Sequence, residues 1–227
     1  MYRALIRTKI SAGIMALLLS GMCHLQATAV TVQEDGISPY EIVSITVPIP
    51  YSGGVYAGLN QLLVDGVLTN GFCIDPFHFS VSGPQPYYVV DLTSAPKDDH
   101  LIAGSHMTGA EAVLISELWA LAYSGIGNDA AKAAALQIAI WEVVGGSDFQ
   151  LTSADDFGAG QLLSMVEAPN YSGPTANLLA LTGPGQDFVI AGDPVPDGGT
   201  TLALFGLALA GLATAGFVEK SALLLNR

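Results

Sequence analysis

The chain has 227 residues and a formal net charge of −13 at pH 7, and a surface this acidic repels the phosphate backbone of nucleic acids. It has no basic stripe interleaved with aromatic residues, so nucleic-acid binding is not expected. The hydrophobic fraction of 51% and the mean hydropathy of +0.49 resemble those of a membrane protein, but much of the excess lies near the two ends. The length suits one domain of ordinary size flanked by processing segments.

The N-terminus has the three parts of a secretion signal. Three basic residues stand within the first nine positions, an apolar run covers 14–19, and Ala27-Thr28-Ala29 places small residues where a signal peptidase reads. We therefore expect residues 1–29 to be a signal peptide that is removed by cleavage after Ala29.

Cleavage there leaves Cys73 as the single cysteine of the mature protein. The other cysteine, Cys23, follows Met22 rather than a small residue, which argues against lipid attachment. Cysteines in an oxidising compartment are normally paired. The lone thiol is therefore either a buried small hydrophobe or a sulfur that is bonded to something other than a second cysteine.

Residues 30–91 have the short alternating apolar runs of β-strands. Turn residues interrupt them at Gly53-Gly54, Asp65-Gly66 and Asn70-Gly71, and we expect hairpins at these three places. A strand at 87–91 should follow the loop at 83–86. Farther along, the region 171–191 indicates loops and a closing strand at 187–190.

The pattern changes to helices after residue 107. Thr108 and Glu111 have the spacing of a capping box, which predicts a helix over 110–123. A second helix is expected over 128–144, ending at Gly145-Gly146, and a third over 155–167. The predicted fold class is therefore α+β: a β-rich barrel or sandwich with two or three helices packed on it.

The C-terminal segment 195–227 has the make-up of a sorting or anchoring tail. Residues 200–218 are all apolar, small or Thr, close to the length that a helix needs to cross a bilayer. A short motif precedes this span and consists of Val195, Pro196, Asp197, Gly198 and Gly199. The protein thus divides into a signal peptide at 1–29, an extracellular domain at 30–194 and this tail.

The tail resembles the PEP-CTERM class of sorting signals in Gram-negative bacteria, in the variant that opens with Val-Pro-Asp. The resemblance implies a secreted protein of the cell surface or extracellular matrix, transiently anchored in the membrane by its C-terminal helix and cut by an exosortase-type sorting protease. Glu219-Lys220 stands where that class has an arginine cluster, which leaves open whether the tail is cut.

The second predicted helix carries a glutamine on an apolar face. Gln137, Ile140, Trp141 and Val144 stand at i, i+3, i+4 and i+7, so they share one side that should be buried. Leaving a carboxamide unpaired there costs about 1–3 kcal/mol. The amide must therefore hydrogen-bond to the backbone of a neighbouring strand, or be consumed chemically.

The lone cysteine lies in a short strand-like segment. The period of a strand places Phe72 and Ile74 on one side and Cys73 and Asp75 on the other, and Pro76 ends the run. A helix that lies across the second side would meet the Cys73 sulfur.

Together the two segments resemble the thioester domains of bacterial surface proteins, in which the cysteine of an aromatic-Cys-Ile-Asp motif is joined to the glutamine of a Gln-x-Ala-Ile-Trp motif. Cys73 and Gln137 match the joined pair, and the resemblance spans about 55–146. It implies that the Cys73 sulfur displaces ammonia from the Gln137 amide and forms an internal thioester. An amine or hydroxyl of a surface ligand would then take the acyl group, a single-use step rather than enzymatic turnover.

Three further residues receive supporting roles in this hypothesis. Phe72 and Trp141 are candidates to shield the bond from water. Asp75 orients the cysteine loop, polarises an attacking group or caps a turn, and the turn cap is favoured. The alternative function is a non-reactive structural or matrix protein of the same fold, in which Cys73 stays a free buried thiol.

A secreted hydrolase is the third possibility, with a carboxylate pair drawn from Glu111, Glu117 and Glu142. Glu111 already serves the capping box, and the other two fit exposed helix positions. The acidic pairs Asp98-Asp99 and Asp155-Asp156 do not have the alternating pattern of a calcium loop.

No metal or cofactor is expected. The three histidines outside the signal do not have the spacing of a metal pair on a helix, and we interpret them as surface or structural residues: His78, His100 and His106.

Overall fold

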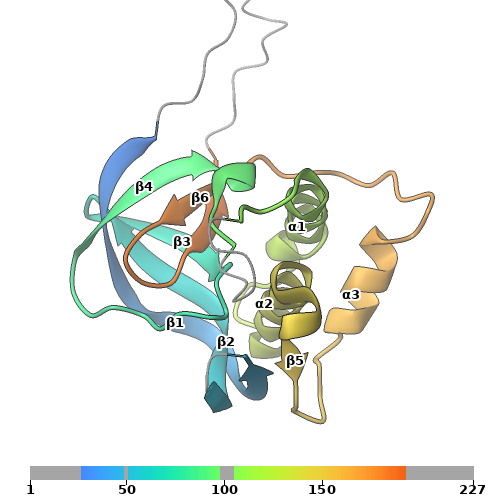
Figure 1. Cartoon of the computed structure of the whole chain (residues 1–227). Coiled ribbons are helices and arrows are strands. Elements are labelled where there is room, and N and C mark those ends of the chain that lie inside the picture. The colour runs from blue at the N-terminus through green and yellow to red at the C-terminus, as the bar shows by residue number, and fades with distance from the viewer. Residues whose placement is uncertain (1–26, 49–50, 98–104, 193–227) are drawn as a thin grey trace, which may run out of the picture.

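The computed structural model describes residues 27–48, 51–97 and 105–192 (Figure 1). The predicted sorting tail and most of the predicted signal peptide lie outside these residues. Strand β1 begins at Thr28, so the last two residues of the predicted signal, Thr28 and Ala29, pair with Val89 and Tyr88. Cleavage after Ala29 would therefore leave Val30 as the first residue of this strand.

The strands form one antiparallel sheet of seven, in the order β2-β3-β7-β6-β4-β1-β5, with an additional pairing of β2 with β1. Because β1 pairs with β4 through its first residues and with β2 through the rest, six of the strands close into a ring. The predicted α+β class is confirmed, and the ring corresponds to its barrel form. The bounds are β1 Thr28–Val47, β2 Tyr51–Val64, β3 Val67–Cys73, β4 Gln85–Asp91, β5 Gln150–Leu151, β6 Leu178–Thr182 and β7 Phe188–Ala191.

Of the three predicted hairpins, only one is a turn. Asp65 and Gly66 have φ values of 49° and 81° and join β2 to β3. Gly53-Gly54 lies inside β2 and Asn70-Gly71 inside β3, so these two predictions were wrong. A Cβ at Gly71 would lie 2.8 Å from the Val189 carbonyl oxygen. The glycine there permits close approach of β7 rather than a turn.

The helices are α1 (Gly109–Ala122), α2 (Ala130–Gly145) and α3 (Ala159–Val166), with short 3₁₀ turns at Leu92–Ser94, Tyr123–Gly125 and Gly146–Asp148. The capping box is present: Glu111 N–H donates to Thr108 Oγ1 at 3.2 Å, and Thr108 N–H donates to the Glu111 carboxylate at 2.8 Å. Helix α3 starts later than predicted because Asp155 and Asp156 accept backbone N–H groups in a preceding turn. Strand β6, in a region predicted mainly as loops, was missed.

Helix α2 is the centre of the molecule. It packs against β1, β2 and β3 on one side and against α1 and α3 on the other, and Figure 1 shows the three helices together on one side of the strands. Every residue from 133 to 141 is at most 4% exposed. A helix that is apolar all round is buried on all sides, so the predicted buried face of α2 extends round its whole circumference.

Within the described ranges, no helix is both long and apolar enough to cross a bilayer. The predicted membrane helix of the tail lies outside those ranges.

The alanines of α2 predict a test of this packing. Ala139 is fully buried, so Ala139→Leu should lower the free energy of unfolding by about 1–3 kcal/mol through overpacking. Ala131→Leu, at a partly exposed position of the same helix, should change it by much less. Urea denaturation of the two variants compares them, and equal losses would contradict a central position of α2.

Candidate functional site: a cysteine and a glutamine beside a cavity

The Gln137 side chain pairs with the backbone of Cys73. Cys73 N–H donates to Gln137 Oε1 at 2.9 Å, and Gln137 Nε2 donates to the Cys73 carbonyl oxygen at 2.8 Å. Gln137 is 1% exposed and Cys73 is 3% exposed. The glutamine amide thus takes the place of a neighbouring strand at the end of β3, and the two residues singled out from the sequence lie in direct contact.

The Cys73 sulfur points into the turn that follows β3. The thiol donates to the Asp75 carbonyl oxygen at 3.2 Å, and Asp75 N–H approaches the sulfur at 3.3 Å. The Asp75 carboxylate caps the same turn, since Phe77 N–H donates to Oδ1 at 3.1 Å. Its second oxygen, Oδ2, lies 2.7 Å from His78 Nδ1. The favoured role of Asp75 as a turn cap agrees with this geometry.

Burial raises the pKa of the Cys73 thiol far above its ordinary value, and the charge of the nearby Asp75 carboxylate raises it further. The Trp141 indole N–H acts in the opposite direction, although it does not meet the geometry of a hydrogen bond to the sulfur or to any other acceptor among the described residues. Ionisation of a free thiol at this position is therefore disfavoured.

A cavity of about 310 Å³ lies beside the sulfur. Its apolar walls come mainly from β1, β2 and the turn after β3, while Cys73, His78 and Trp141 line it together with the buried Asn60. Pockets of this size that combine apolar walls with a few polar groups are typical of small-ligand sites. The cysteine thus borders a space that a small group can enter.

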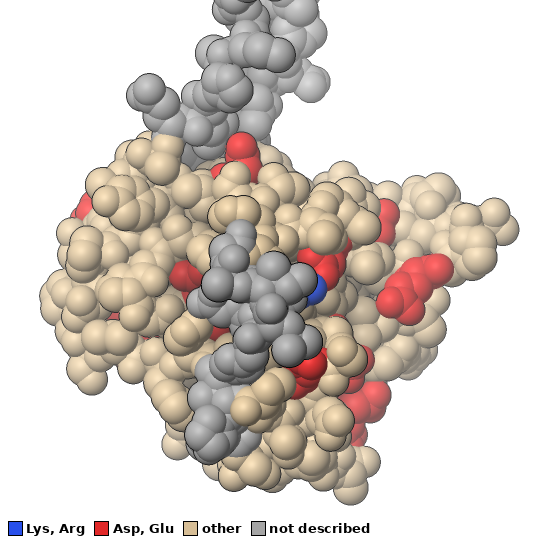
Figure 2. All heavy atoms as spheres, in the orientation of Figure 1, with Lys and Arg blue, Asp and Glu red and all other residues tan. Residues whose placement is uncertain are grey.

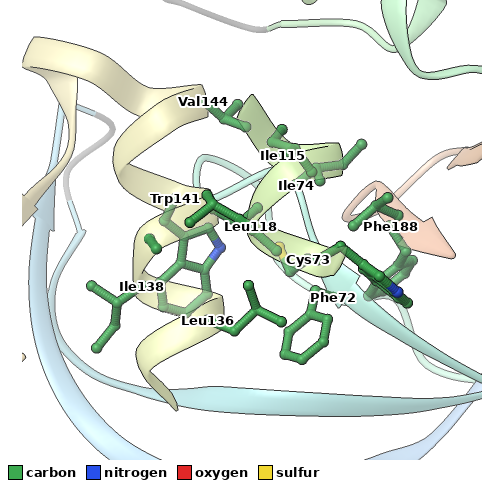
Figure 3. Packing of buried hydrophobic residues seen from close by; sticks show 14 of the residues in the cluster. Phe72, Cys73, Ile74, Ile115, Leu118, Leu136, Ile138, Trp141, Val144 and Phe188 are labelled. Atoms are coloured by element: carbon green, nitrogen blue, oxygen red, sulfur yellow. The ribbon is translucent and has the colours of Figure 1, made fainter. Parts of the chain in front are cut away.

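The two residues predicted as shields lie in different places. Figure 3 shows the Trp141 indole with its nitrogen on the side of Cys73, and Trp141 lines the cavity. Phe72 packs instead against Trp119 and Tyr123, with ring centroids 5.6 and 6.4 Å apart. Trp141 is therefore placed to cover the cavity side of the pair, and Phe72 supports β3 from the α1 side.

Acidic groups lie near the site. Burial raises the pKa of Glu34, and the hydrogen bond from Ser80 to its carboxylate only partly offsets this. Asp187 is 5% exposed and accepts a hydrogen bond from Gly183 N–H at 3.0 Å. Figure 2 shows further acidic side chains on the outer surface, mainly over the helices. The electrostatic environment thus favours cationic over anionic ligands.

The sequence analysis interpreted His78 as a surface or structural residue, and its exposed position agrees with this, but its place beside the cavity was not predicted. His78 borders the cavity and holds the Asp75 carboxylate. The spacing Cys73-x-Asp75-x-x-His78 could have indicated this position, because residues this close within one turn can border the same cavity. His106 forms an isolated antiparallel β-bridge with Pro96, and His100 lies outside the described residues. No group of three or more potential metal ligands occurs in the parts of the protein that are described.

Two of the three carboxylates considered for a hydrolase lie together at a second cavity. Glu111 and Glu142 line a second cavity of about 490 Å³, together with Glu167, and Glu117 does not. Burial opposes ionisation of Glu111, but hydrogen bonds from Lys97 and Thr108 lower its pKa overall. Glu111 is therefore committed to an ion pair. Glu142 is half-buried rather than exposed, and this burial raises its pKa.

Comparison with known protein families finds one match, the VPDSG-CTERM motif, at residues 194–215. This supports the predicted PEP-CTERM-like tail and indicates an exported, surface-associated bacterial protein that a C-terminal sorting protease processes. Comparison with curated proteins and with solved structures finds no significant match. The thioester-domain resemblance therefore remains a prediction.

The pairing of Gln137 with Cys73 predicts a large effect of removing the amide. In a Cys73→Ala background, where the two residues cannot bond covalently, Gln137→Met leaves the N–H and C=O of residue 73 buried without partners. Each orphaned group should lower the free energy of unfolding by about 1–3 kcal/mol. Gln150→Met, at an exposed position of β5, is the control. Denaturant titration measures both, and a loss no greater than that of the control would contradict the pairing.

Proposed function

We propose that this exported surface protein attaches covalently to a target amine or hydroxyl through an internal thioester between Cys73 and Gln137. The observation that supports it is the contact of the Gln137 carboxamide with Cys73. Only Cα and Cβ separate the Cys73 nitrogen from its sulfur. The sulfur and the carboxamide carbon therefore both lie close to the Cys73 backbone. A change of the Cys73 side-chain rotamer is the movement that would bring them together.

The bond-forming step is balanced within the protein. The sulfur adds to Cδ of Gln137, the bond from Cδ to Nε2 breaks, and the thiol proton leaves with the nitrogen as ammonia. An acceptor amine then forms a bond to Cδ and loses a proton, and the Cys73 thiol is regenerated. The target becomes joined to the protein through the side chain of residue 137 by an amide.

A second function is favoured by the same hydrogen bonds. They satisfy both ends of the Gln137 amide without any bond to sulfur, as a purely structural role requires. In that case the protein is a non-reactive surface or matrix component, and Cys73 is a free buried thiol. The two functions differ in one covalent bond, which can be detected directly.

The intact mass of the purified mature domain tests for that bond. A thioester makes the mass lower than the calculated value by one ammonia, whereas Cys73→Ala and Gln137→Ala should each have their full calculated masses. Gln150→Ala is the matched control and should keep the deficit. A full mass for the unaltered domain, with one thiol titratable after denaturation, would establish the structural alternative.

Methylamine provides a second, chemical test of the same proposal. It should add to residue 137 and release a thiol at Cys73, and peptide mapping locates both changes. Denatured protein that has been hydrolysed first should not take up the amine. Uptake that is unchanged in Cys73→Ala would show that the amine reacts elsewhere, and the thioester would be ruled out.

The tail is expected to determine where the protein ends up. In a bacterial host with the sorting protease, protein lacking residues 195–227 should appear in the medium instead of the surface fraction, because the motif and anchor are missing. Replacing Val195-Pro196-Asp197 by three alanines, with the apolar span intact, should leave an uncut and membrane-bound form. Fractionation with mass determination of the C-terminus distinguishes these outcomes, and normal processing of the alanine variant would argue against recognition of the motif.

A further inference from the structure

One residue, Asp75, connects the Cys73 sulfur to an imidazole. Its backbone carbonyl oxygen and N–H lie 3.2 and 3.3 Å from the sulfur, and its carboxylate lies 2.7 Å from His78 Nδ1. Asp75 is 8% exposed, so its position is fixed by burial. The side chain of His78 is 43% exposed, and both His78 and Cys73 line the cavity. The imidazole and the cysteine therefore border the same cavity, and the imidazole is the more exposed of the two.

The environment of the sulfur creates a need for such a group. Acyl transfer from a Cys73 thioester expels sulfur, and burial with the nearby carboxylate makes a free thiolate costly at this place. The attacking amine also has to lose a proton once it has bonded to carbon. A group that accepts the first proton and returns one to the sulfur removes both obstacles.

We propose that His78 is this proton-transfer group and that Asp75 positions it. With Nδ1 directed to the Asp75 carboxylate, Nε2 is the ring nitrogen that exchanges the proton. The inference rests on the proposed thioester, because it concerns the step in which the acyl group passes to an amine in the cavity.

The transfer conserves atoms and charge. The amine nitrogen bonds to Cδ of residue 137, and Nε2 of His78 takes one of its protons. The bond from Cδ to the Cys73 sulfur then breaks, and the imidazolium returns the proton to the sulfur. The products are an amide and a neutral thiol. Asp75 stays ionised throughout and stabilises the transient imidazolium.

Three other titratable groups lie near this site. Glu34, which accepts a hydrogen bond from Ser80 of the cavity wall, and Asp187, beside the end of β3, are acidic. Burial raises the pKa of Tyr87, and the charges of Glu34 and Asp187 raise it further. The lining of the cavity includes none of the three, so none of them can replace the imidazole as a proton carrier there.

The test compares His78→Ala with His106→Ala, a histidine that does not line the cavity. Both variants should retain the mass deficit of one ammonia. The rate of methylamine addition should fall at least about tenfold in His78→Ala, given the typical contribution of general acid–base catalysis, and should be unchanged in His106→Ala. Added imidazole should restore much of the rate in His78→Ala only, a rescue that loss of a merely structural contact would not show.

The outcomes separate this inference from the proposed function. If the unaltered domain has its full calculated mass, both fail together. If it has the deficit and His78→Ala reacts at the normal rate, or reacts slowly without rescue by imidazole, only the role of His78 is overturned. Loss of the deficit in a His78→Ala protein that is folded by circular dichroism would also overturn it, because His78 would then be needed for the bond to form.

Discussion

The hydrogen bonds between the Gln137 carboxamide and the Cys73 backbone fix the relation between the helices and the barrel. They hold the middle of α2 against Cys73, the last residue of β3. The Cys73 N–H and C=O bond there to the glutamine side chain instead of to a strand. A buried carboxamide without partners would be costly, so α2 has little freedom to slide or rotate. The buried alanines on α2 permit the close approach that these short bonds require.

The same contact suits a structural role and the proposed reactive role equally well. A carboxamide that must satisfy two backbone groups of a cysteine is also held next to that cysteine's sulfur. The two roles differ only in what is bonded to the sulfur. As a free thiol, Cys73 donates a hydrogen bond to the Asp75 carbonyl oxygen, and its burial disfavours ionisation. Burial leaves Cys73 only 3% exposed and makes its thiol hard to ionise. The same burial limits the contact of Cys73 with solvent, which a thioester at this place would need in order to survive.

Local sequence signals predicted the features that depend on local physics. The Asp65-Gly66 turn and the Thr108 cap follow from backbone preferences of a few residues, and the buried position of Gln137 follows from helical periodicity. The local Asn70-Gly71 pattern wrongly predicted a turn. The glycine is instead required by the close approach of β7, a strand distant in the sequence. The position of His78 beside the cavity was not predicted for a similar reason, since residues of β1 and β2, distant in the sequence, form that cavity with the turn after β3.

Basic side chains are scarce in the described part of the protein and lie away from the candidate site. Two lysines, Lys97 and Lys132, and no arginine are present among the described residues. Lys97 pairs with Glu111, and Lys132 donates to the Gly125 carbonyl oxygen at 3.2 Å. Neither lines the cavity beside Cys73. No lysine of the described residues is therefore placed to enter that cavity, as the proposed thioester requires if its acyl group is to pass to another molecule.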